Sequence, residues 1–231
     1  MKEKEKLISI KGIIIEIIIF ILFYFSSYFQ LIPILLLNLN LKKISGAQQV
    51  MLSTFSNVVL LIILFLIFRK ELINEWKKFK NNFLEDIDIG VKYWLIGLGI
   101  MMVSNIIINF VINLGQAANE QAVQQMISSL PWLMLINAGI IAPCTEEIVF
   151  RKGFKKAFPN KWLFIISSAL IFGLLHVITT MTQPLELLYI IPYGALGGAF
   201  ACIYQKTESI YPSIAMHMFH NSALVILSTL I

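Results

Sequence analysis

Seven long apolar segments run through this chain of 231 residues, and they leave it few ways to fold. A helix of about 20 mostly apolar residues spans the hydrocarbon core of a bilayer. Hydrophobic residues make up 58% of the sequence and charged residues only 13%, which excludes an ordinary soluble domain. We therefore expect an all-α, polytopic helix bundle of about seven transmembrane helices, forming a single integral membrane domain over 1–231. The expected spans are residues 12–37, 50–68, 93–114, 132–157, 161–179, 185–204 and 210–230.

Lysine and arginine residues are distributed unevenly between the two sides that this order of spans creates. If the N-terminus is cytoplasmic, all but two of the 18 basic residues fall on the inside, and only Lys42 and Lys43 fall outside. The inside loops of membrane proteins carry the excess of positive charge. We therefore predict a multi-pass protein of the cell (plasma) membrane with its N-terminus in the cytoplasm and its C-terminus outside. These flanking residues account for the net charge of +5, so no nucleic-acid partner is expected.

Four local features refine this topology. Pro33 is expected to kink or end the first span. That span is interpreted as a retained helix, because no small-residue cleavage site follows the first apolar run. Residues 72–87 carry apolar side chains at helical spacing, which predicts an amphipathic helix on the cytoplasmic leaflet, with a solvated loop as the alternative. Residues 118–130 carry a weaker apolar stripe, which predicts a connector or else a cap on the outer side.

Five polar residues interrupt the apolar runs in the second half of the chain. Glu146 and Glu147 lie in the fourth span, His176 in the fifth, and His217 and Asn221 in the seventh. A carboxylate inside a bilayer costs at least ~2.5 kcal/mol, so such residues pair with a partner or perform chemistry. Depths can be counted from the cytoplasmic end of each span at the helical rise. Glu146 then lies about 16 Å deep, His176 about 22 Å, His217 about 14 Å and Asn221 about 20 Å. Three helices thus bring four polar side chains to one level near the middle of the membrane.

The two adjacent glutamates point in different directions. Glu147 and Arg151 are four residues apart, so they share a helix face and can form an ion pair. Glu146 is rotated by about 100° from Glu147 and has no such partner on its own helix. We therefore expect Glu147 and Arg151 to be supporting residues and Glu146 to face the interior of the bundle.

The residue types indicate hydrolysis. Glu146 can take a proton from water and direct the water at a carbonyl group, while His176 holds that water and shuttles the proton. His217 and Asn221 can donate hydrogen bonds to the developing oxyanion. Such donors stabilise the transition state more strongly in a low-dielectric site than in water. Glu146, His176, His217 and Asn221 are therefore the predicted catalytic residues.

Each feature also has a simpler explanation. The glutamates and Arg151 can be an interfacial ion network if the fourth span ends early. His176 alone can be a packing histidine, and the polar residues of the last span can be an interhelical hydrogen-bond pair. A small proton-coupled transporter is another alternative, because buried glutamate and histidine also build proton relays. That class is built from matching halves with broken helices, a pattern that this sequence does not show.

Metal and serine chemistry have distinct sequence patterns. The sequence contains no His-Glu-x-x-His and no Gly-x-Ser-x-Gly, so it lacks the zinc-peptidase helix and the elbow serine. Asn221 is a poor zinc ligand, and adjacent glutamates point apart. We expect no cofactor and no metal, and the alternative is a zinc ion held by His176, His217 and Glu146.

Three motifs occur in order, and together they carry a family resemblance. They are Glu146-Glu147-x-x-x-Arg151, Phe172-x-x-x-His176 and His217-x-x-x-Asn221. They resemble the three-part pattern of the CAAX-protease and bacteriocin-processing family (CPBP, also called Abi), whose best-known members are the type II CAAX prenyl endopeptidases. The pair Gly197-Gly198, the segment 204–207 and Ser209 also look similar to that family. The resemblance covers a catalytic core at about 131–231 and does not include the N-terminal spans.

This resemblance implies an intramembrane endopeptidase in which Glu146 activates water with the help of His176. It implies that His217 and Asn221 form the oxyanion site, with Phe172 as a supporting residue. The implied partners are a membrane-associated peptide or protein substrate and the lipid bilayer. Bacterial relatives are linked to peptide maturation, bacteriocin self-immunity and signalling, so a non-catalytic immunity or binding protein of the same fold is the main alternative.

Overall fold

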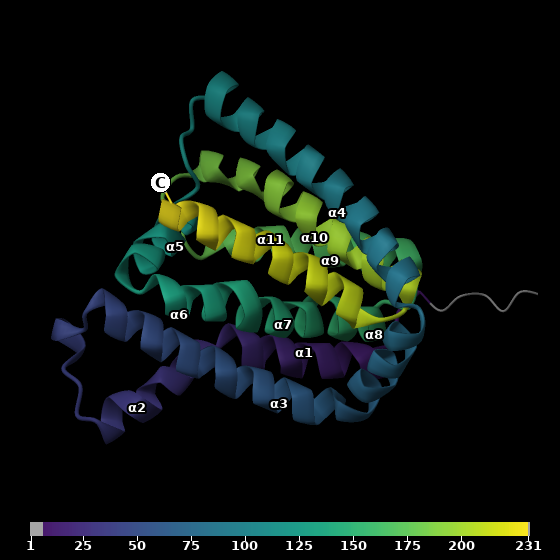
Figure 1. Cartoon of the computed structure of the whole chain (residues 1–231), viewed down its shortest axis with the longest axis horizontal. Coiled ribbons are helices and arrows are strands. Elements are labelled where there is room, and N and C mark those ends of the chain that lie inside the picture. Colours follow the sequence, from purple (N-terminus) through teal and green to yellow (C-terminus); the bar gives the residue numbers. More distant parts are fainter. Residues whose placement is uncertain (1–6, 231) are drawn as a thin grey trace, which may run out of the picture.

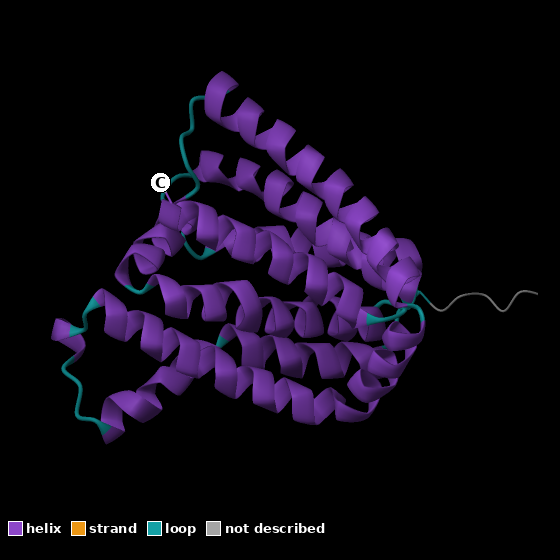
Figure 2. Cartoon of the chain, in the orientation of Figure 1, coloured by secondary structure: helices purple, strands orange, loops and turns teal. Residues whose placement is uncertain are grey.

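The computed structural model describes residues 7–230, and all regular structure in this part of the chain is helical (Figures 1 and 2). Six helices are long and apolar enough to cross a membrane, or up to seven if one bent pair counts as a single span. The expected all-α, polytopic bundle is therefore confirmed. The elements are α1 (Ile10–Tyr24), η1 (Ser26–Gln30), α2 (Leu31–Leu36), η2 (Leu41–Lys43), α3 (Gly46–Asn81), α4 (Phe83–Ile106), η3 (Ile107–Val111), α5 (Ala118–Ser129), α6 (Pro131–Ile136), η4 (Asn137–Ile141), α7 (Ala142–Glu147), η5 (Ile148–Gly153), α8 (Phe154–Ala157), α9 (Lys161–Ile178), η6 (Pro184–Tyr189), α10 (Ile190–Thr207) and α11 (Ile210–Leu230).

The first span is broken, but not at the expected residue. α1 and the segment formed by η1 and α2 meet at 46°. The break follows Tyr24, whereas Pro33 lies inside α2. Pro33 is the third residue of α2, where a backbone N–H has no acceptor within that helix, so the missing donor is not needed. Ser56 of α3 fixes the break, because its hydroxyl donates a hydrogen bond to the carbonyl oxygen of Ser26.

α3 is one continuous helix of 36 residues, about 54 Å long at the α-helical rise and thus longer than the ~30 Å hydrocarbon core. Residues 72–81 and 83–87 are helical, as expected, but they do not form a helix of their own, because they are the end of α3 and the start of α4. Leu72 and Phe79 are buried, and Trp76 packs edge-on against Tyr211 with ring centroids 4.9 Å apart. An apolar stripe does not distinguish lipid from protein, and here much of it contacts protein.

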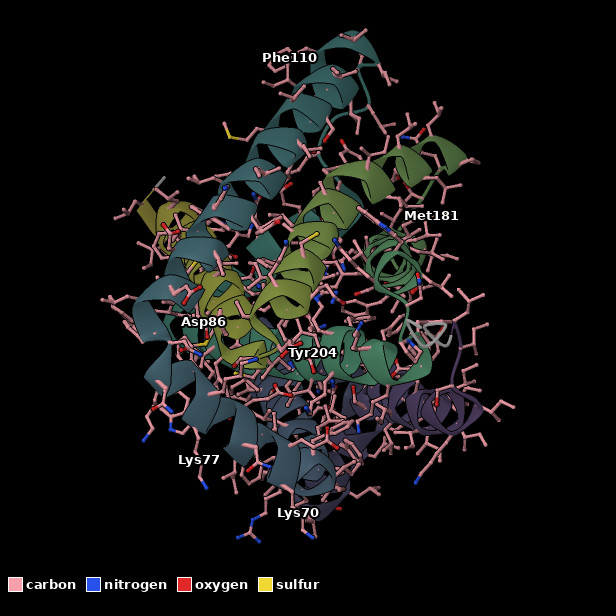
Figure 3. All side chains as sticks on the ribbon, turned by 90° about the vertical axis from the view of Figure 1, so that its right-hand side faces the viewer. Lys70, Lys77, Asp86, Phe110, Met181 and Tyr204 are labelled. Atoms are coloured by element: carbon pink, nitrogen blue, oxygen red, sulfur yellow. The ribbon has the colours of Figure 1, made fainter. Side chains whose placement is uncertain are left out.

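The bundle has two distinct ends (Figure 1). At one end, α1 begins beside α8, where the backbone N–H of Ser9 donates to the carbonyl oxygen of Ala157 at 2.9 Å. Lys70 and Lys77 project outward at this end (Figure 3). α11 ends at the opposite side of the bundle (Figure 1). The predicted inside residues Lys2, Lys4 and Lys6 lie outside the described residues.

Small residues allow helices to approach closely at two important contacts. A Cβ atom added to Gly12 of α1 would lie 1.8 Å from the carbonyl oxygen of Lys156 in α8. A Cβ added to Gly173 of α9 would lie 2.7 Å from the carbonyl oxygen of Ile190 in α10. Contacts of this kind are typical of membrane helices, which gain stability from close van der Waals packing. They bring α1 and α9 close to the central helices.

The fourth crossing, from Pro131 to Ala157, contains two turns with π-helical hydrogen-bond spacing. η4 and η5 are π-helical turns on either side of the short helix α7. Pro143 has no N–H to donate to the carbonyl groups four or five residues before it, those of Gly139 and Ala138. Two side chains of α11 donate there instead: the amide of Asn221 to Ala138 at 3.0 Å and the hydroxyl of Ser222 to Gly139 at 3.3 Å. π-Helical turns are frequent at functional sites, and these two frame the helix that carries both glutamates.

Candidate active site

Glu147 is a fully buried carboxylate with three side-chain partners. Its Oε2 accepts hydrogen bonds from Nε of Arg151, at 3.0 Å, and from the hydroxyl of Ser213. Its Oε1 lies 3.0 Å from Nδ1 of His217. Arg151, also fully buried, donates from Nη1 to the hydroxyl of Ser168 at 2.7 Å. The predicted ion pair is present, and its hydrogen bonds also connect the fourth crossing to α9 and α11.

The contact with Glu147 determines which nitrogen of His217 carries the proton. An ionised carboxylate, as expected beside Arg151, only accepts hydrogen bonds, so Nδ1 of His217 is the donor. In the neutral ring Nε2 then keeps its lone pair. Nε2 lies 3.7 Å from Oε2 of Glu146, which is beyond hydrogen-bond distance. His217 therefore stands between the two glutamates and can donate from Nε2 only as an imidazolium ion.

Glu146, the neighbouring carboxylate, lies in a different environment. Its side chain is 16% exposed, and its Oε2 has no hydrogen-bond partner among residues 7–230. The side chain lines an open cavity of about 490 Å³, and His176 lines the same cavity from α9. A buried polar atom usually has a partner, so a carboxylate that lines a cavity and has an unpaired oxygen is a group to which water or a substrate group can bind.

His176 is held in place by its own helix and by aromatic rings. Its Nδ1 lies 2.8 Å from the carbonyl oxygen of Phe172, which can only accept, so Nδ1 carries the proton and Nε2 the lone pair. The ring stacks on Tyr193, with centroids 4.8 Å apart, and contacts the Phe172 ring at 4.4 Å. The Phe172 ring also lies 5.9 Å from that of His217 and 4.9 Å from the guanidinium of Arg151. Phe172, predicted as a supporting residue, is thus the common neighbour of both histidines and the buried arginine.

Asn221 binds to backbone and does not line this cavity. It lies one turn beyond His217 in α11, and its amide donates to the carbonyl oxygen of Ala138. That bond uses one of the two N–H groups of the amide. The structure therefore brings Glu146, Glu147, Arg151, Phe172 and the two predicted histidines together, and it ties Asn221 to η4.

Three contributors to the site were not predicted from the sequence: Ser168, Tyr193 and Ser213. Ser213 precedes His217 by four residues, and Ser168 precedes Phe172 by four, so each lies on the same helix face as a predicted residue. That periodicity was the available signal for both serines. Tyr193 stacks on His176 from another helix, and its hydroxyl accepts a hydrogen bond from the amide of Asn119 at 3.4 Å. No sequence spacing indicates such a contact between helices.

A bound metal ion needs several donor side chains close together. Within residues 7–230, no group of three histidine, cysteine, aspartate or glutamate side chains is arranged to hold one. The alternative zinc set of Glu146, His176 and His217 therefore does not have the spacing of a preformed metal site.

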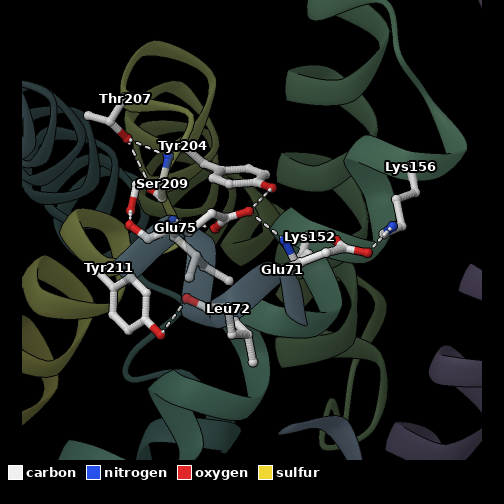
Figure 4. Close-up of polar contacts among 10 residues, drawn as sticks. Glu71, Leu72, Glu75, Lys152, Lys156, Tyr204, Thr207, Ser209 and Tyr211 are labelled. Carbon is white, nitrogen blue, oxygen red and sulfur yellow. Dashed lines mark hydrogen bonds and ion pairs between the residues drawn. The ribbon is translucent and has the colours of Figure 1, made fainter. Parts of the chain in front are cut away.

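A second ion network adjoins the site at Lys152, the residue after Arg151 (Figure 4). Lys152 is nearly fully buried and pairs with Glu75 and, at 3.0 Å, with Glu71 of α3. Glu75 also accepts hydrogen bonds from the hydroxyl of Tyr204, at 3.3 Å, and from the backbone N–H of Ile210, at 2.9 Å. Consecutive residues of η5 thus bind different carboxylates: Arg151 binds the buried Glu147, and Lys152 binds the partly exposed Glu71 and Glu75. This arrangement fixes the orientation of η5, and with it that of Arg151.

Comparisons with known proteins give one family and several relatives. Residues 128–223 match the family described as type II CAAX prenyl endopeptidase Rce1-like. The "Putative membrane peptidase YdiL" of Bacillus subtilis (strain 168) is 29% identical over 186 residues, which cover 76% of this chain and 70% of that protein. Two proteins of Lactococcus lactis subsp. lactis (strain IL1403) are also similar. UPF0177 protein YbdI is 27% identical, with 65% of this chain and 83% of the relative covered, and UPF0177 protein YxdF is 25% identical, with 73% and 95% covered. No solved structure matches the chain.

Proposed function

Residues 128–223 of this multi-pass membrane protein belong to the Rce1-like family of type II CAAX prenyl endopeptidases, and on this basis we propose that the protein is an intramembrane endopeptidase. Its substrate is a membrane-associated peptide or protein. The family match and the relative named as a membrane peptidase support a membrane protease at the level of the family. One observation carries the finer assignment to Glu146. The Glu146 side chain lines a cavity, and its buried Oε2 has no hydrogen-bond partner among the described residues and lies 3.7 Å from a histidine nitrogen.

In the proposed reaction Glu146 accepts a proton from a water molecule in the cavity, and the water oxygen attacks the carbonyl carbon of the scissile bond. The tetrahedral intermediate collapses as its C–N bond breaks, and the leaving nitrogen takes the proton from Glu146. His176 orients the water through the lone pair on Nε2. The products are a carboxylate and an amine, and no covalent bond to the protein forms.

His217 acts on the developing negative charge when its ring is protonated, because its neutral ring carries the only proton on Nδ1. Glu147 fixes the orientation of the ring, since its carboxylate lies 3.0 Å from Nδ1. A buried carboxylate orients a histidine in the same way in serine proteases. We therefore assign Glu147 a positioning role in addition to its ion pair with Arg151. The second N–H of the Asn221 amide is left as a further donor to the oxyanion.

The proposed enzyme needs no cofactor; in the alternative, Glu146, His176 and His217 would hold a zinc ion, which would supply Lewis-acid activation of water. We place the protein in the plasma membrane, with the end that carries Lys70 and Lys77 in the cytoplasm. The end of α11 then lies outside. Labelling of single cysteines introduced at the two ends tests this orientation, and a C-terminus that is labelled only from the cytoplasmic side would contradict it.

The proposed activity is tested by comparing peptide termini in membranes of cells that express the wild type, Glu146→Gln or Glu208→Gln. In Glu146→Gln the new side chain keeps the shape of the old one, but the base is removed. Glu208 is a matched control, because it is an exposed glutamate that pairs with Lys78 at 2.8 Å. Mass spectrometry should find new termini with the wild type and Glu208→Gln that are absent with Glu146→Gln. Identical termini in all three samples would contradict the proposal and favour a non-catalytic binding or immunity protein of the same fold.

A further inference from the structure

The cavity at Glu146 has a wall that lies outside residues 128–223. This wall is a run of residues around the break in the first span: Phe23, Tyr24, Phe25, Ser27 and Tyr28. Glu146 and Phe150 of the fourth crossing and Leu175 and His176 of α9 line the other side. The family-matched region therefore supplies the proposed reacting groups, and the N-terminal segment supplies the surface that faces them.

The aromatic rings of this wall differ in their exposed fraction. Tyr28, Tyr24 and Phe25 are 63%, 53% and 49% exposed. The centroid of Phe25 lies 5.2 Å from that of Tyr24 and 5.9 Å from that of Tyr28, so the three rings form one cluster, the aromatic mouth. Phe23 is less exposed and meets the buried ring of Phe150 edge-on at 5.3 Å. The cavity thus has an exposed aromatic mouth and a buried aromatic floor.

Ring contacts continue from the floor of the cavity to the proposed catalytic histidine. Phe150 meets Phe172 edge-on at 5.4 Å, and Phe172 contacts His176 at 4.4 Å. A group bound at the aromatic mouth therefore lies in the same cavity as the water that His176 and Glu146 would position.

A hydrogen bond from α3 holds the segment that carries the aromatic mouth. The hydroxyl of Ser56 binds the carbonyl oxygen of Ser26 between Phe25 and Ser27, and the break itself turns the chain by 46°. Ser26 lies 16 residues after Ile10, where α1 starts, which is about 24 Å along the helix axis at the α-helical rise. That distance is shorter than a hydrocarbon core of ~30 Å, so a span that enters the core at Ile10 would carry the mouth at the level of the lipid chains.

The chemistry of the lining restricts what binds there. Among the described residues, Glu146 is the only charged side chain of the lining, and no lysine or arginine contributes. The carboxylate of Glu146 would repel an acidic group in this low-dielectric site. The exposed rings offer edges and faces for offset or edge-on contacts with another ring. The volume of about 490 Å³ lies within the range of ~300–1,000 Å³ that is usual for ligand sites.

We propose that Tyr24, Phe25 and Tyr28 form a specificity pocket that receives an aromatic side chain of the substrate next to the scissile bond. The inference rests on the proposed peptidase function and adds a substrate preference to it. The preference is set by a segment outside the family-matched region. Small side chains leave the rings uncovered, and acidic side chains are excluded.

The test uses full-length Glu146→Gln protein in liposomes, so that a bound peptide is not cleaved. The probe is a biotinylated alanine–leucine peptide with one photoreactive diazirine-phenylalanine, and mass spectrometry locates the cross-links after illumination. The same peptide with phenylalanine, alanine or aspartate at that position competes for the site. We expect cross-links within residues 23–28. The phenylalanine peptide should compete at about tenfold lower concentration than the alanine peptide. The aspartate peptide should compete least even though Glu146→Gln removes the repelling charge, because a carboxylate without a partner is costly to bring into an apolar pocket.

Three further variants separate a specific pocket from general adhesion to the bundle. Phe25→Ala combined with Tyr28→Ala should remove the advantage of the phenylalanine peptide, whereas Tyr28→Phe keeps the ring and should retain most of it. Phe110→Ala is the matched control, because it removes a ring that is 79% exposed and does not line the cavity. It should leave the cross-linking pattern unchanged. All variants are compared after their unfolding temperatures have been shown to match.

Cross-links confined to other parts of the chain would overturn the inference. Equal competition by the phenylalanine and aspartate peptides, or an unchanged preference in the double alanine variant, would also overturn it. The same peptides are then incubated with the wild type. Binding with the expected preference but without cleavage would refute the proposed function and support the specificity pocket. Cleavage without any preference would refute the specificity pocket and support the proposed function.

Discussion

Glu147→Gln is the substitution whose consequences follow most directly from the structure. Glu147 and Arg151 are both fully buried, and Nε of the arginine lies 3.0 Å from the carboxylate. Glutamine keeps the shape of the side chain and an oxygen for Ser213, but it removes the negative charge. Arg151 then stays buried with a hydrogen bond to Ser168 and no counter-charge. Loss of one partner of a buried ion pair lowers the free energy of unfolding by ~3–5 kcal/mol.

A second variant distinguishes the loss of the counter-charge from a general destabilisation by substitution in the core. Glu147→Gln combined with Arg151→Met removes both charges and keeps a long apolar side chain beside Phe172. Replacement of a whole buried pair is often neutral or stabilising by ~1–4 kcal/mol. The double variant should therefore be more stable than Glu147→Gln alone, even though it carries more changes.

The assay is equilibrium unfolding in mixed detergent micelles, followed by the fluorescence of the four tryptophans. Glu146→Gln is the control, because Oε2 of Glu146 has no hydrogen-bond partner among residues 7–230, and its stability should stay within about 0.5 kcal/mol of the wild type. A Glu147→Gln protein as stable as this control would refute the reasoning. A double variant less stable than the single one would refute it independently.

Three further outcomes follow from other contacts. Asn221→Ala and Ser222→Ala should each lower the free energy of unfolding by ~1–3 kcal/mol, because each leaves a carbonyl group of η4 without its donor. This loss of stability should be smaller when Pro143→Ala restores a backbone N–H. Gly12→Ala should destabilise the protein by ~1–3 kcal/mol in the same assay, since its Cβ would meet the carbonyl oxygen of Lys156 at 1.8 Å, whereas Gly99→Ala, with open space around it, should not. Cleavage should persist after prolonged chelation, and activity that is lost with a chelator and restored by zinc would show that the zinc alternative is correct.

The spans were predictable because bilayer thickness sets the length of an apolar helix. The pairing of Glu147 with Arg151 was predictable for a similar reason, since residues four apart share a helix face. Both inferences depend only on local sequence, and the structure contains the spans and the pair. The depth argument also placed Glu146, His176, His217 and Asn221 at one level, and the ring of Phe172 contacts those of both histidines.

The features that sequence reasoning missed depend on contacts between distant segments. The break after Tyr24 is fixed by Ser56, which lies 30 residues from its partner Ser26. The carbonyl groups near Pro143 receive donors from residues 83 positions away, so the role of Asn221 in η4 cannot be read from local spacing. The extension of α3 was missed because an apolar stripe is compatible with either lipid or protein as its neighbour.

The central claim is that Glu146 activates the attacking water, and one rate comparison tests it most directly. The termini found in membranes identify a substrate, and its cleavage is then measured for the wild type and Glu146→Gln in proteoliposomes, with both proteins shown to unfold at the same temperature. Loss of a general base should lower kcat by about 10²–10⁴-fold, and more if no other group replaces it. Cleavage by Glu146→Gln at a rate close to that of the wild type would contradict the assignment of Glu146 as the base.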